Sequence, residues 1–375
     1  MNEFEFIRRL REQTASRNRS TRVITSIGDD GSVIRQSADR DLVVTTDLLV
    51  EEIDFHRAAI PPRLLGHKAL AVSLSDIAAM GARPICSLVS IGLPDQVWQS
   101  DFKDEFFAGY LALADRFGVT LAGGDISQSK QIVIDSIVLG EAAAGSAVLR
   151  SNAKAGDQVF VTGALGGAAA GLKLIELGAR VDQRSEIRSQ RSVRAVTAGT
   201  EPLAVAGGLV SEPRRVGVAT GSTTHQSDDD AIQALLLRQL QPQPRVGWGI
   251  ILGEEQLATS MIDISDGLSS DLHHLCTESN VGALIESAAI PIDQHVKTLC
   301  GRRALDPLAL ALHGGEDFEL LFTVRPADIQ RLPKLVDGIS VSRIGEITDQ
   351  AEVIRLHEKD RVWNLEPKGF EHFAK

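Results

Sequence analysis

The alternation of apolar and polar residues predicts strands and helices in turn along the first 150 residues. Short apolar runs predict strands within 22–34, 41–50, 85–94, 119–127 and 131–142. The first of these is interrupted by a Gly-Asp-Asp-Gly turn, and 119–127 runs into a glycine turn. Apolar residues at helical spacing predict helices at 4–15, 62–82 and 101–118.

The remaining chain predicts a second unit of the same kind. A strand at 158–162 leads through a glycine-rich loop into a helix, 258–280 reads as a strand turning into a helix, and 309–324 reads as a turn followed by a strand. Residues 183–230 are arginine-rich and then small and polar, which predicts a loosely ordered insertion, either a solvated loop or a basic arm. We therefore expect an α/β fold with mixed sheets and two domains, 1–150 and 151–375.

Length, charge and cysteine content narrow the class of protein. A chain of 375 residues suits two domains, and a net charge of −11 argues against a nucleic-acid partner. Three widely spaced cysteines favour a reducing compartment over a disulfide framework. The charged N-terminus has no signal-peptide pattern, and there is no apolar run of about 18 residues. The expectation is a cytoplasmic protein without a membrane span.

Aspartates recur where apolar elements end or bend. They lie in or at the end of a predicted strand, in a turn, or within an apolar helix: Asp30, Asp47, Asp76, Asp125, Asp263 and Asp266. Carboxylates accompanied by small hydroxyls are hard oxygen ligands, which select Mg²⁺ or Mn²⁺ over zinc. Several such ions usually serve a polyphosphate during transfer. The set therefore indicates phosphoryl-transfer chemistry.

Each of these signals also has a simpler interpretation. Asp76 fits a polar helix stripe that faces water, and Asp266 fits the N-cap of the following helix. The sequence has no P-loop pattern and no protein-kinase catalytic loop. The glycine-rich run 162–172 suits a phosphate-binding loop or close packing of a helix on its sheet equally well.

Several longer motifs resemble one known family. In order they are SIGDDGSV, TTDLLVE, KALAVSLSDIAAMGA, LAGGD, LRSNAKAGDQVFVTGALGGAAAGL, MIDISDGLSSDL, LHGGEDFELLFTV and WNLEPKGFEHF. Together they resemble the thiamine-monophosphate kinase family of the aminoimidazole-ribonucleotide-synthetase-like superfamily, over nearly the whole chain outside 183–230. The resemblance implies Mg²⁺-dependent transfer of the ATP γ-phosphoryl group to thiamine monophosphate, giving thiamine diphosphate and ADP. It also implies a homodimer formed through the N-terminal domain.

The same resemblance assigns roles to individual residues, with no side-chain acid or base among them. The implied metal ligands are Asp30, Thr45, Thr46, Asp47, Asp76, Asp125, Asp263 and Asp266. The implied ATP contacts are Gly124, Asp125, Arg150 and Ser265. The implied contacts to thiamine phosphate are Asp54, Glu316 and Phe370.

The chain departs from the family pattern at one of these residues and at a few neighbouring positions. Asp54 replaces a usual histidine, and His56 lies two residues on, which would share a strand face with it. Ile126 replaces a threonine, and Gly167 and Ala168 remove polar groups from the glycine-rich loop. None of these changes touches an expected metal aspartate.

Two other classes of function remain open from the sequence. One is another ATP-dependent synthetase of the superfamily, although selenophosphate synthetases carry a reactive cysteine near the N-terminus and no cysteine precedes Cys86 here. The other is a catalytically silent dimer that binds nucleotide and regulates a partner.

Overall fold

The structure is a computed structural model, and it describes residues 3–15, 20–182, 223–303 and 305–370. Residues 183–222 of the predicted insertion lie outside this part of the chain. The remaining residues of that prediction, 223–230, are helical, because α7 runs from Thr223 to Leu240. The expectation of irregular structure up to residue 230 was therefore wrong for 223–230.

The N-terminal half forms a six-stranded mixed sheet. Its strands lie in the order β1-β2-β3-β6-β4-β5, and all neighbours are antiparallel except β4 and β5. Their bounds are β1 Val23–Thr25, β2 Ser32–Arg35, β3 Arg40–Val50, β4 Arg83–Leu93, β5 Thr120–Gln128 and β6 Val133–Ala143. The helices of this half are α1 Glu3–Ala15, α2 Pro62–Ala79, α3 Asp95–Trp98 and α4 Phe102–Phe117.

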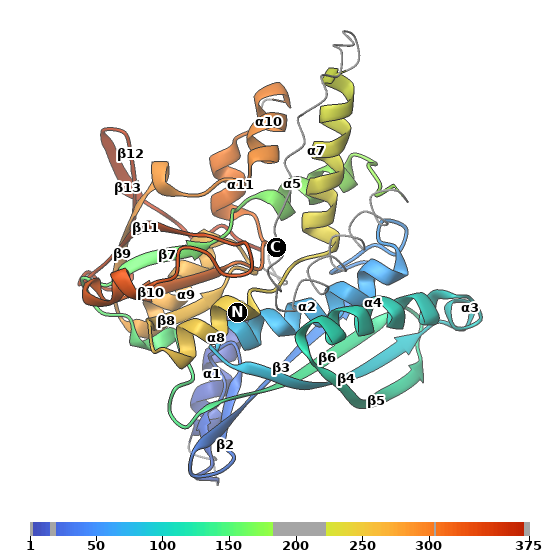
Figure 1. Ribbon diagram of the computed structural model, residues 1–375, viewed down its shortest axis with the longest axis horizontal. Coiled ribbons are helices and arrows are strands. Elements are labelled where there is room, and N and C mark those ends of the chain that lie inside the picture. Colours follow the sequence, from blue (N-terminus) through green and yellow to red (C-terminus); the bar gives the residue numbers. More distant parts are fainter. Residues whose placement is uncertain (1–2, 16–19, 183–222, 304, 371–375) are drawn as a thin grey trace, which may run out of the picture.

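Helices α2 and α4 cover one face of this sheet (Figure 1). They pack so closely that a Cβ at Gly66 would lie 1.9 Å from the carbonyl oxygen of Phe106. Nearly every residue of α2 is buried, which agrees with a sequence that is apolar all round. This helix is therefore a core element, so any charged residue on it needs a partner.

The C-terminal half forms a seven-stranded mixed sheet in the order β13-β12-β9-β11-β7-β10-β8, in which only β12 and β9 are parallel neighbours. Its strands are β7 Gln158–Thr162, β8 Ala258–Asp263, β9 Gly282–Glu286, β10 Leu320–Val324, β11 Val341–Thr348, β12 Ile354–Glu358 and β13 Arg361–Asn364. The further helices are α5 Gly167–Glu176, α8 Val246–Glu254, α9 Leu268–Ser279, α10 Gln294–Arg303 and α11 Pro307–His313.

The predicted α/β class with mixed sheets is confirmed, and three further local predictions are wrong. The glycines of 119–127 lie inside strand β5 rather than in a turn. Residues 309–313 belong to α11, which Asp306 caps by accepting a hydrogen bond from the N–H of Leu308. Residues 51–56 form a turn, so the argument that Asp54 and His56 share a strand face does not hold.

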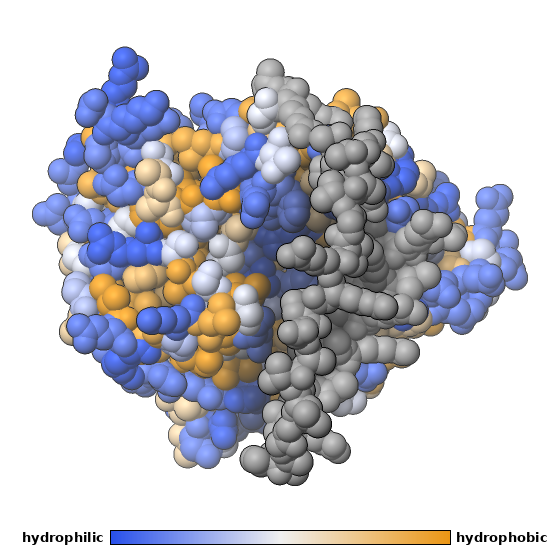
Figure 2. Space-filling view, turned by 45° about the horizontal axis from the view of Figure 1, so that its top comes forward, coloured by the Kyte–Doolittle hydropathy of each residue, from blue (hydrophilic) through white to orange (hydrophobic). Residues whose placement is uncertain are grey.

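The two halves share apolar packing. One hydrophobic cluster joins α2 and α4 to α7, α8 and β10 through residues such as Leu74, Leu236, Trp248 and Phe322. The face in Figure 2 is mostly hydrophilic, with scattered hydrophobic patches and a recess near its middle. Among the described residues, no helix combines the length and apolar character that a membrane span requires.

Candidate active site

Three of the predicted aspartates meet where the two halves join. Asp30 lies in the turn between β1 and β2, Asp76 lies near the end of α2, and Asp263 is the last residue of β8. One carboxylate oxygen from each lies within 4.8 Å of the others. All three come from separate elements, so the fold itself assembles this acidic cluster.

Burial and repulsion between neighbouring charges make Asp76 and Asp263 reluctant to ionise. Burial, followed by the charges of Asp47, Asp263 and Asp30, raises the pKa of Asp76 well above its usual value. Burial and the neighbouring Asp30 likewise raise the pKa of Asp263 to about 8. Neutral hydroxyls donate to the cluster, from Thr45 to Asp76 and from Ser75 to Asp263 at 2.6 Å. These hydroxyls are neutral and do not cancel the repulsion between the carboxylates, whereas a bound divalent cation would.

Asp47 lies beside the cluster on β3, whereas its neighbour Thr46 is exposed. Burial, opposed by a hydrogen bond from Ser73, raises the pKa of Asp47 to about 6, and the charges of Asp135 and Asp30 add to the rise. Its Oδ2 is buried and has no hydrogen-bond partner among the described residues. Thr46 instead donates to Asp135 at 2.6 Å. An unpartnered buried oxygen is costly, so Asp47 fits a ligand position better than a structural one.

Arg150 supplies the positive charge at this junction. Its guanidinium forms an ion pair with Asp30, and its backbone N–H donates to Asp29 at 3.2 Å. Although burial opposes a charged guanidinium, Asp30 and Asp29 raise the pKa of Arg150, which keeps it positive. Burial and Asp30 also raise the pKa of Asp29 to about 7. Arg150 therefore lies against the predicted metal site.

The structure does not bring Asp125 into contact with the acidic cluster. Asp125 is exposed on edge strand β5, in register with Ser90 of β4, which pairs in turn with Asp135 of β6. It thus shares a row of the sheet with Asp135. The preceding Gly124 has φ +153°, and a Cβ there would lie 1.9 Å from the carbonyl oxygen of Val89. Glycine at this position lets β5 lie directly against β4.

The turn at 264–267 connects the acidic cluster to a neighbouring cleft. Asp271 holds the turn, because its carboxylate accepts hydrogen bonds from the N–H groups of Asp266 and Gly267. The carbonyl oxygen of Ser265 accepts from the N–H of Glu316 at 2.7 Å, and that of Asp266 accepts from the N–H of Phe370 at 3.2 Å. The turn that carries the predicted metal ligand Asp266 therefore contacts the two segments that carry Glu316 and Phe370, both predicted to bind the substrate.

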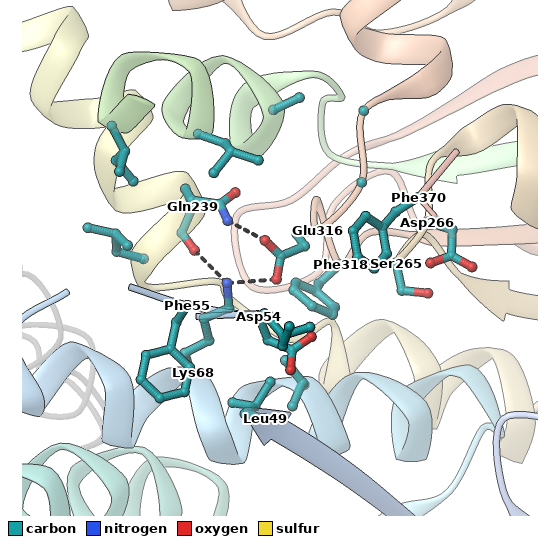
Figure 3. A pocket seen from close by; sticks show the side chains of 18 of the residues that line it. Leu49, Asp54, Phe55, Lys68, Gln239, Ser265, Asp266, Glu316, Phe318 and Phe370 are labelled. Atoms are coloured by element: carbon teal, nitrogen blue, oxygen red, sulfur yellow. Dashed lines mark hydrogen bonds and ion pairs between the residues drawn. The ribbon is translucent and has the colours of Figure 1, made fainter. Parts of the chain in front are cut away.

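A cleft of about 620 Å³ lies beside this turn, between the two halves of the chain. Its walls include Asp54, Glu316 and Phe370, the three residues predicted to bind thiamine phosphate, together with Asp47 and Asp266. Figure 3 shows the three predicted substrate residues and Asp266 around the cleft, with Phe55 and Phe318 adding aromatic surface. The structure thus places the predicted metal and substrate residues around one cavity.

Asp54 is engaged in its own turn. Its Oδ2 accepts a hydrogen bond from the N–H of Val50 at 2.7 Å, and His56 pairs with Glu52 at 3.0 Å. Both Asp54 and His56 still line the cleft. Asp54, which replaces the histidine that is usual in the family, therefore stabilises the turn at 51–56.

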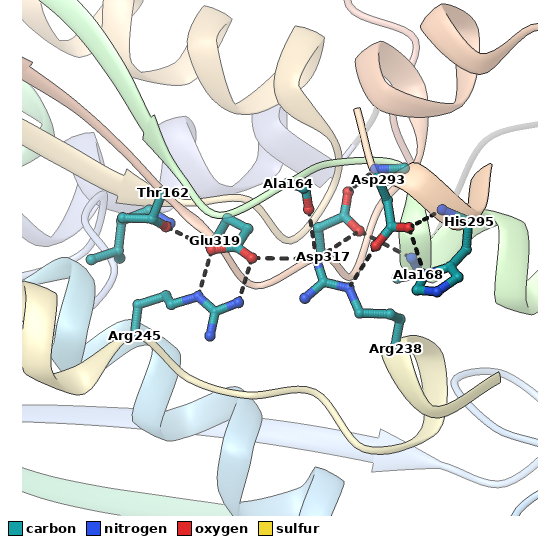
Figure 4. A network of polar contacts seen from close by, with 11 residues as sticks. Thr162, Ala164, Ala168, Arg238, Arg245, Asp293, His295, Asp317 and Glu319 are labelled. Carbon is teal, nitrogen blue, oxygen red and sulfur yellow. Dashed lines mark hydrogen bonds and ion pairs between the residues drawn. The ribbon is translucent and has the colours of Figure 1, made fainter. Parts of the chain in front are cut away.

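Glu316 lies in a loop with unusual backbone geometry, residues 314–319. Glu316 and Phe318 have φ values of +66° and +48°, a backbone conformation that residues other than glycine rarely adopt. The alternate residues, Asp317 and Glu319, are buried and bound to arginines in the network of Figure 4. These anchors hold the loop so that Glu316 and Phe318 face the cleft.

The glycine-rich loop before α5 packs closely instead of presenting free N–H groups. The carboxylate of Asp317 accepts hydrogen bonds from the N–H groups of Gly166 and Ala168, at 2.6 and 3.0 Å. A Cβ at Gly171 would lie 2.2 Å from the carbonyl oxygen of Leu235 in α7. Of the two interpretations that the sequence left open, the contacts support close packing.

Sequence reasoning missed four polar residues at this site: Lys68, Asp135, Gln239 and Asp271. Lys68 carried a usable signal, because it is a cation within a helix that is apolar all round. The other three depend on contacts between residues far apart in the chain, which no local pattern reveals.

Comparison with known proteins agrees with this geometry. The family model described as AIR synthase related protein, N-terminal domain, matches residues 28–142, and the corresponding C-terminal domain model matches 214–357. These matches span more than half of the chain and define its class as an AIR synthase related protein.

Full-length relatives narrow the class further. The thiamine-monophosphate kinase of Buchnera aphidicola (subsp. Schizaphis graminum) is 32% identical over 99% of each chain, and that of Escherichia coli K12 is 32% identical over 96% of this chain and 95% of its own. The chain therefore belongs to the thiamine-monophosphate kinase family, as its motifs predicted.

Solved structures show the same fold. One described as AaThiL complexed with AMPPCP and TMP is 28% identical, covers 99% of this chain and 97% of its own, and has a TM-score of 0.74. The thiamine-monophosphate kinase of Stenotrophomonas maltophilia K279a is 31% identical, covers 96% and 98%, and has a TM-score of 0.68.

Proposed function

We propose that this protein transfers the γ-phosphoryl group of ATP to thiamine monophosphate, forming thiamine diphosphate and ADP. The observation that carries the proposal is the meeting of Asp30, Asp76 and Asp263 beside the cleft that Glu316 and Phe370 line. Family membership supports the same reaction, because relatives over the full length are named thiamine-monophosphate kinases.

The residues at the junction fit Mg²⁺. The donor set consists of carboxylate oxygens, and Asp47 offers a buried oxygen with no partner among the described residues. Asp30, Asp47, Asp76 and Asp263 would hold the ions, with Thr45, Thr46, Asp125 and Asp266 as the further predicted ligands. Bound Mg²⁺ would neutralise the charge of the phosphates that must approach one another.

The side chains of this site position reactants rather than move protons. The attacking phosphate of thiamine monophosphate is already anionic, so the reaction needs no strong general base. Arg150 would contribute a fixed positive charge toward the ATP phosphates, and Gly124, Asp125 and Ser265 are the further predicted ATP contacts. Asp54, Glu316 and Phe370 would hold the acceptor in the cleft.

The proposed arrangement has two domains, 1–150 and 151–375, and a homodimer. Exposed apolar side chains on β3 and β4 support an interface on the six-stranded sheet: Leu48 and Ile85 are 58% and 39% exposed. Sedimentation equilibrium of the wild type should give twice the chain mass. A monomer at all concentrations would reject this interface.

Mass detection of thiamine diphosphate after mixing the protein with MgATP and thiamine monophosphate tests the function directly. ADP release without that acceptor would favour another enzyme of the superfamily. Absence of both products with intact nucleotide binding would favour a silent nucleotide-binding dimer.

A further inference from the structure

Helix α2 carries a buried lysine that faces the cleft. Lys68 is 1% exposed, and its Nζ lies 2.6 Å from Oε1 of Glu316 and 3.4 Å from the carbonyl oxygen of Gln239 (Figure 3). A buried ammonium group is costly unless it is paired, so Lys68 depends on Glu316 for its place in the core.

The second oxygen of Glu316 is bound from another element. Gln239, in the last turn of α7, is 4% exposed and donates its Nε2 to Oε2 of Glu316. The amide must present its NH₂ group here, because its oxygen would face a carboxylate oxygen and repel it. Oε1 of Gln239 is buried without a partner among the described residues. Gln239 therefore holds Glu316 at the cost of an unsatisfied acceptor of its own.

These two donors define one orientation for Glu316. Each carboxylate oxygen takes one donor and keeps a lone pair for another, and the Glu316 side chain is 30% exposed in a residue that lines the cleft. The neighbouring residue of α7, Arg238, lies 3.3 Å from Glu319 and 4.0 Å from Asp317 in the same loop. The end of α7 thus fixes both the loop and its one cleft-facing carboxylate.

We propose that Lys68 and Gln239 are positioning residues that fix the carboxylate of Glu316 for recognition of the positively charged ring system of the acceptor. This inference rests on the proposed function, since thiamine monophosphate carries a thiazolium cation. Lys68 lies behind the carboxylate and, together with Gln239, restricts its rotation. Glu316 then meets the cationic ring without a cost of reorientation.

A double-mutant cycle tests whether Lys68 acts through Glu316. The variants are Lys68→Met, Glu316→Gln and the pair together, each assayed for kcat and for KM of both substrates. Calorimetry would add the Kd of thiamine monophosphate. Each single change should weaken acceptor binding by about tenfold. The double variant should bind the acceptor at least as tightly as whichever single variant binds it less tightly. Lys68→Arg should recover most of the loss, and Gln239→Met should behave like Lys68→Met.

Controls separate positioning from a general loss of charge or of fold. Lys103→Met removes a lysine from the surface of α4 and should leave acceptor KM and Kd unchanged. KM for ATP should change less than about twofold in every variant. Losses that multiply in the double variant, or that fall mainly on ATP, would overturn the inference. A wild type that makes no thiamine diphosphate would instead reject the proposed function.

Discussion

The hydroxyl of Ser75 donates a hydrogen bond to Asp263 at 2.6 Å, and this contact joins residues 188 positions apart. Ser75 belongs to the helix that covers the N-terminal sheet, and Asp263 ends a strand of the C-terminal sheet. The adjacent Asp76 completes the acidic cluster. The site therefore exists only where the two halves meet, and its chemistry depends on that junction.

Asp76→Asn should separate the fold of this junction from its chemistry. The amide cannot ionise and so avoids the charge repulsion that raises the pKa of Asp76; the metal-free variant should therefore unfold at the same or a higher temperature than the wild type. Its kinase rate should fall at least about a hundredfold, because one ligand of the proposed metal site is lost. Asp104→Asn, on the exposed surface of α4, is the matched control. Near wild-type turnover in Asp76→Asn would reject the metal role.

The sequence indicated two members of the acidic cluster, Asp76 and Asp263, because each interrupts a strong apolar pattern. Asp30 gave a weaker signal, since it lies in a glycine turn where aspartate is common. A carboxylate among Ser73, Leu74 and Ile77 stands out in any buried helix, and Asp263 stands out at the end of a buried strand. The position of Asp125 could not be read in this way, because Gly123 and Gly124 suggested a turn. In the structure Gly124 allows the close contact between β4 and β5, whereas Gly123 has room for a Cβ.

The residues around the cleft show where local patterns stop being informative. Gln239 lies in an ordinary helix, and only tertiary packing brings it to Glu316. The turn at Asp54 was hidden because 51–56 follows a strand without glycine or proline, and its geometry depends on the hydrogen bond from Val50. These contacts are decided by the meeting of the two halves rather than by propensity.

Gly124→Ala should damage the proposed ATP-binding side of the site through the backbone. The added Cβ would lie 1.9 Å from the carbonyl oxygen of Val89, and backbone atoms cannot move aside as a flexible side chain can. We expect a lower unfolding temperature and a KM for ATP raised by about tenfold. At Gly123 the nearest atom is Cδ2 of Leu88 at 3.7 Å, so Gly123→Ala is a matched control that should be tolerated. Equal behaviour of the two variants would contradict this reasoning.

Glu319→Gln should be among the more destabilising single changes at this site. Glu319 is fully buried and bound by Arg245, Arg238 and Thr162; although burial acts against ionisation, Arg245 and Arg238 hold its pKa below the usual value. The variant leaves two arginines without their shared anion, which should cost about 3–5 kcal/mol in the free energy of unfolding. Urea denaturation measures this loss.

The control for this change is Glu254→Gln, which breaks the exposed pair with Arg83 at 2.8 Å. A surface ion pair contributes about 0–1 kcal/mol, so the control should unfold close to the wild-type midpoint. A loss in Glu319→Gln no larger than in this control would show that the arginines are satisfied without Glu319.

His67 should make the stability of the protein sensitive to acid. Burial lowers the pKa of His67 to about 4, and its Nε2 lies 2.7 Å from the carbonyl oxygen of Pro242, so the neutral imidazole is the donor. His67 binds a proton near pH 6.5 in the unfolded chain and near pH 4 in the folded chain. Stability from this group is therefore complete above pH 6.5 and is lost as the pH falls toward 4, by up to about 3 kcal/mol. In His67→Gln, which keeps an N–H donor, urea denaturation between pH 7 and 4.5 should show a smaller loss of stability than in the wild type. Equal pH slopes in the two proteins would exclude His67 as the source, because the remaining titrating groups are common to both.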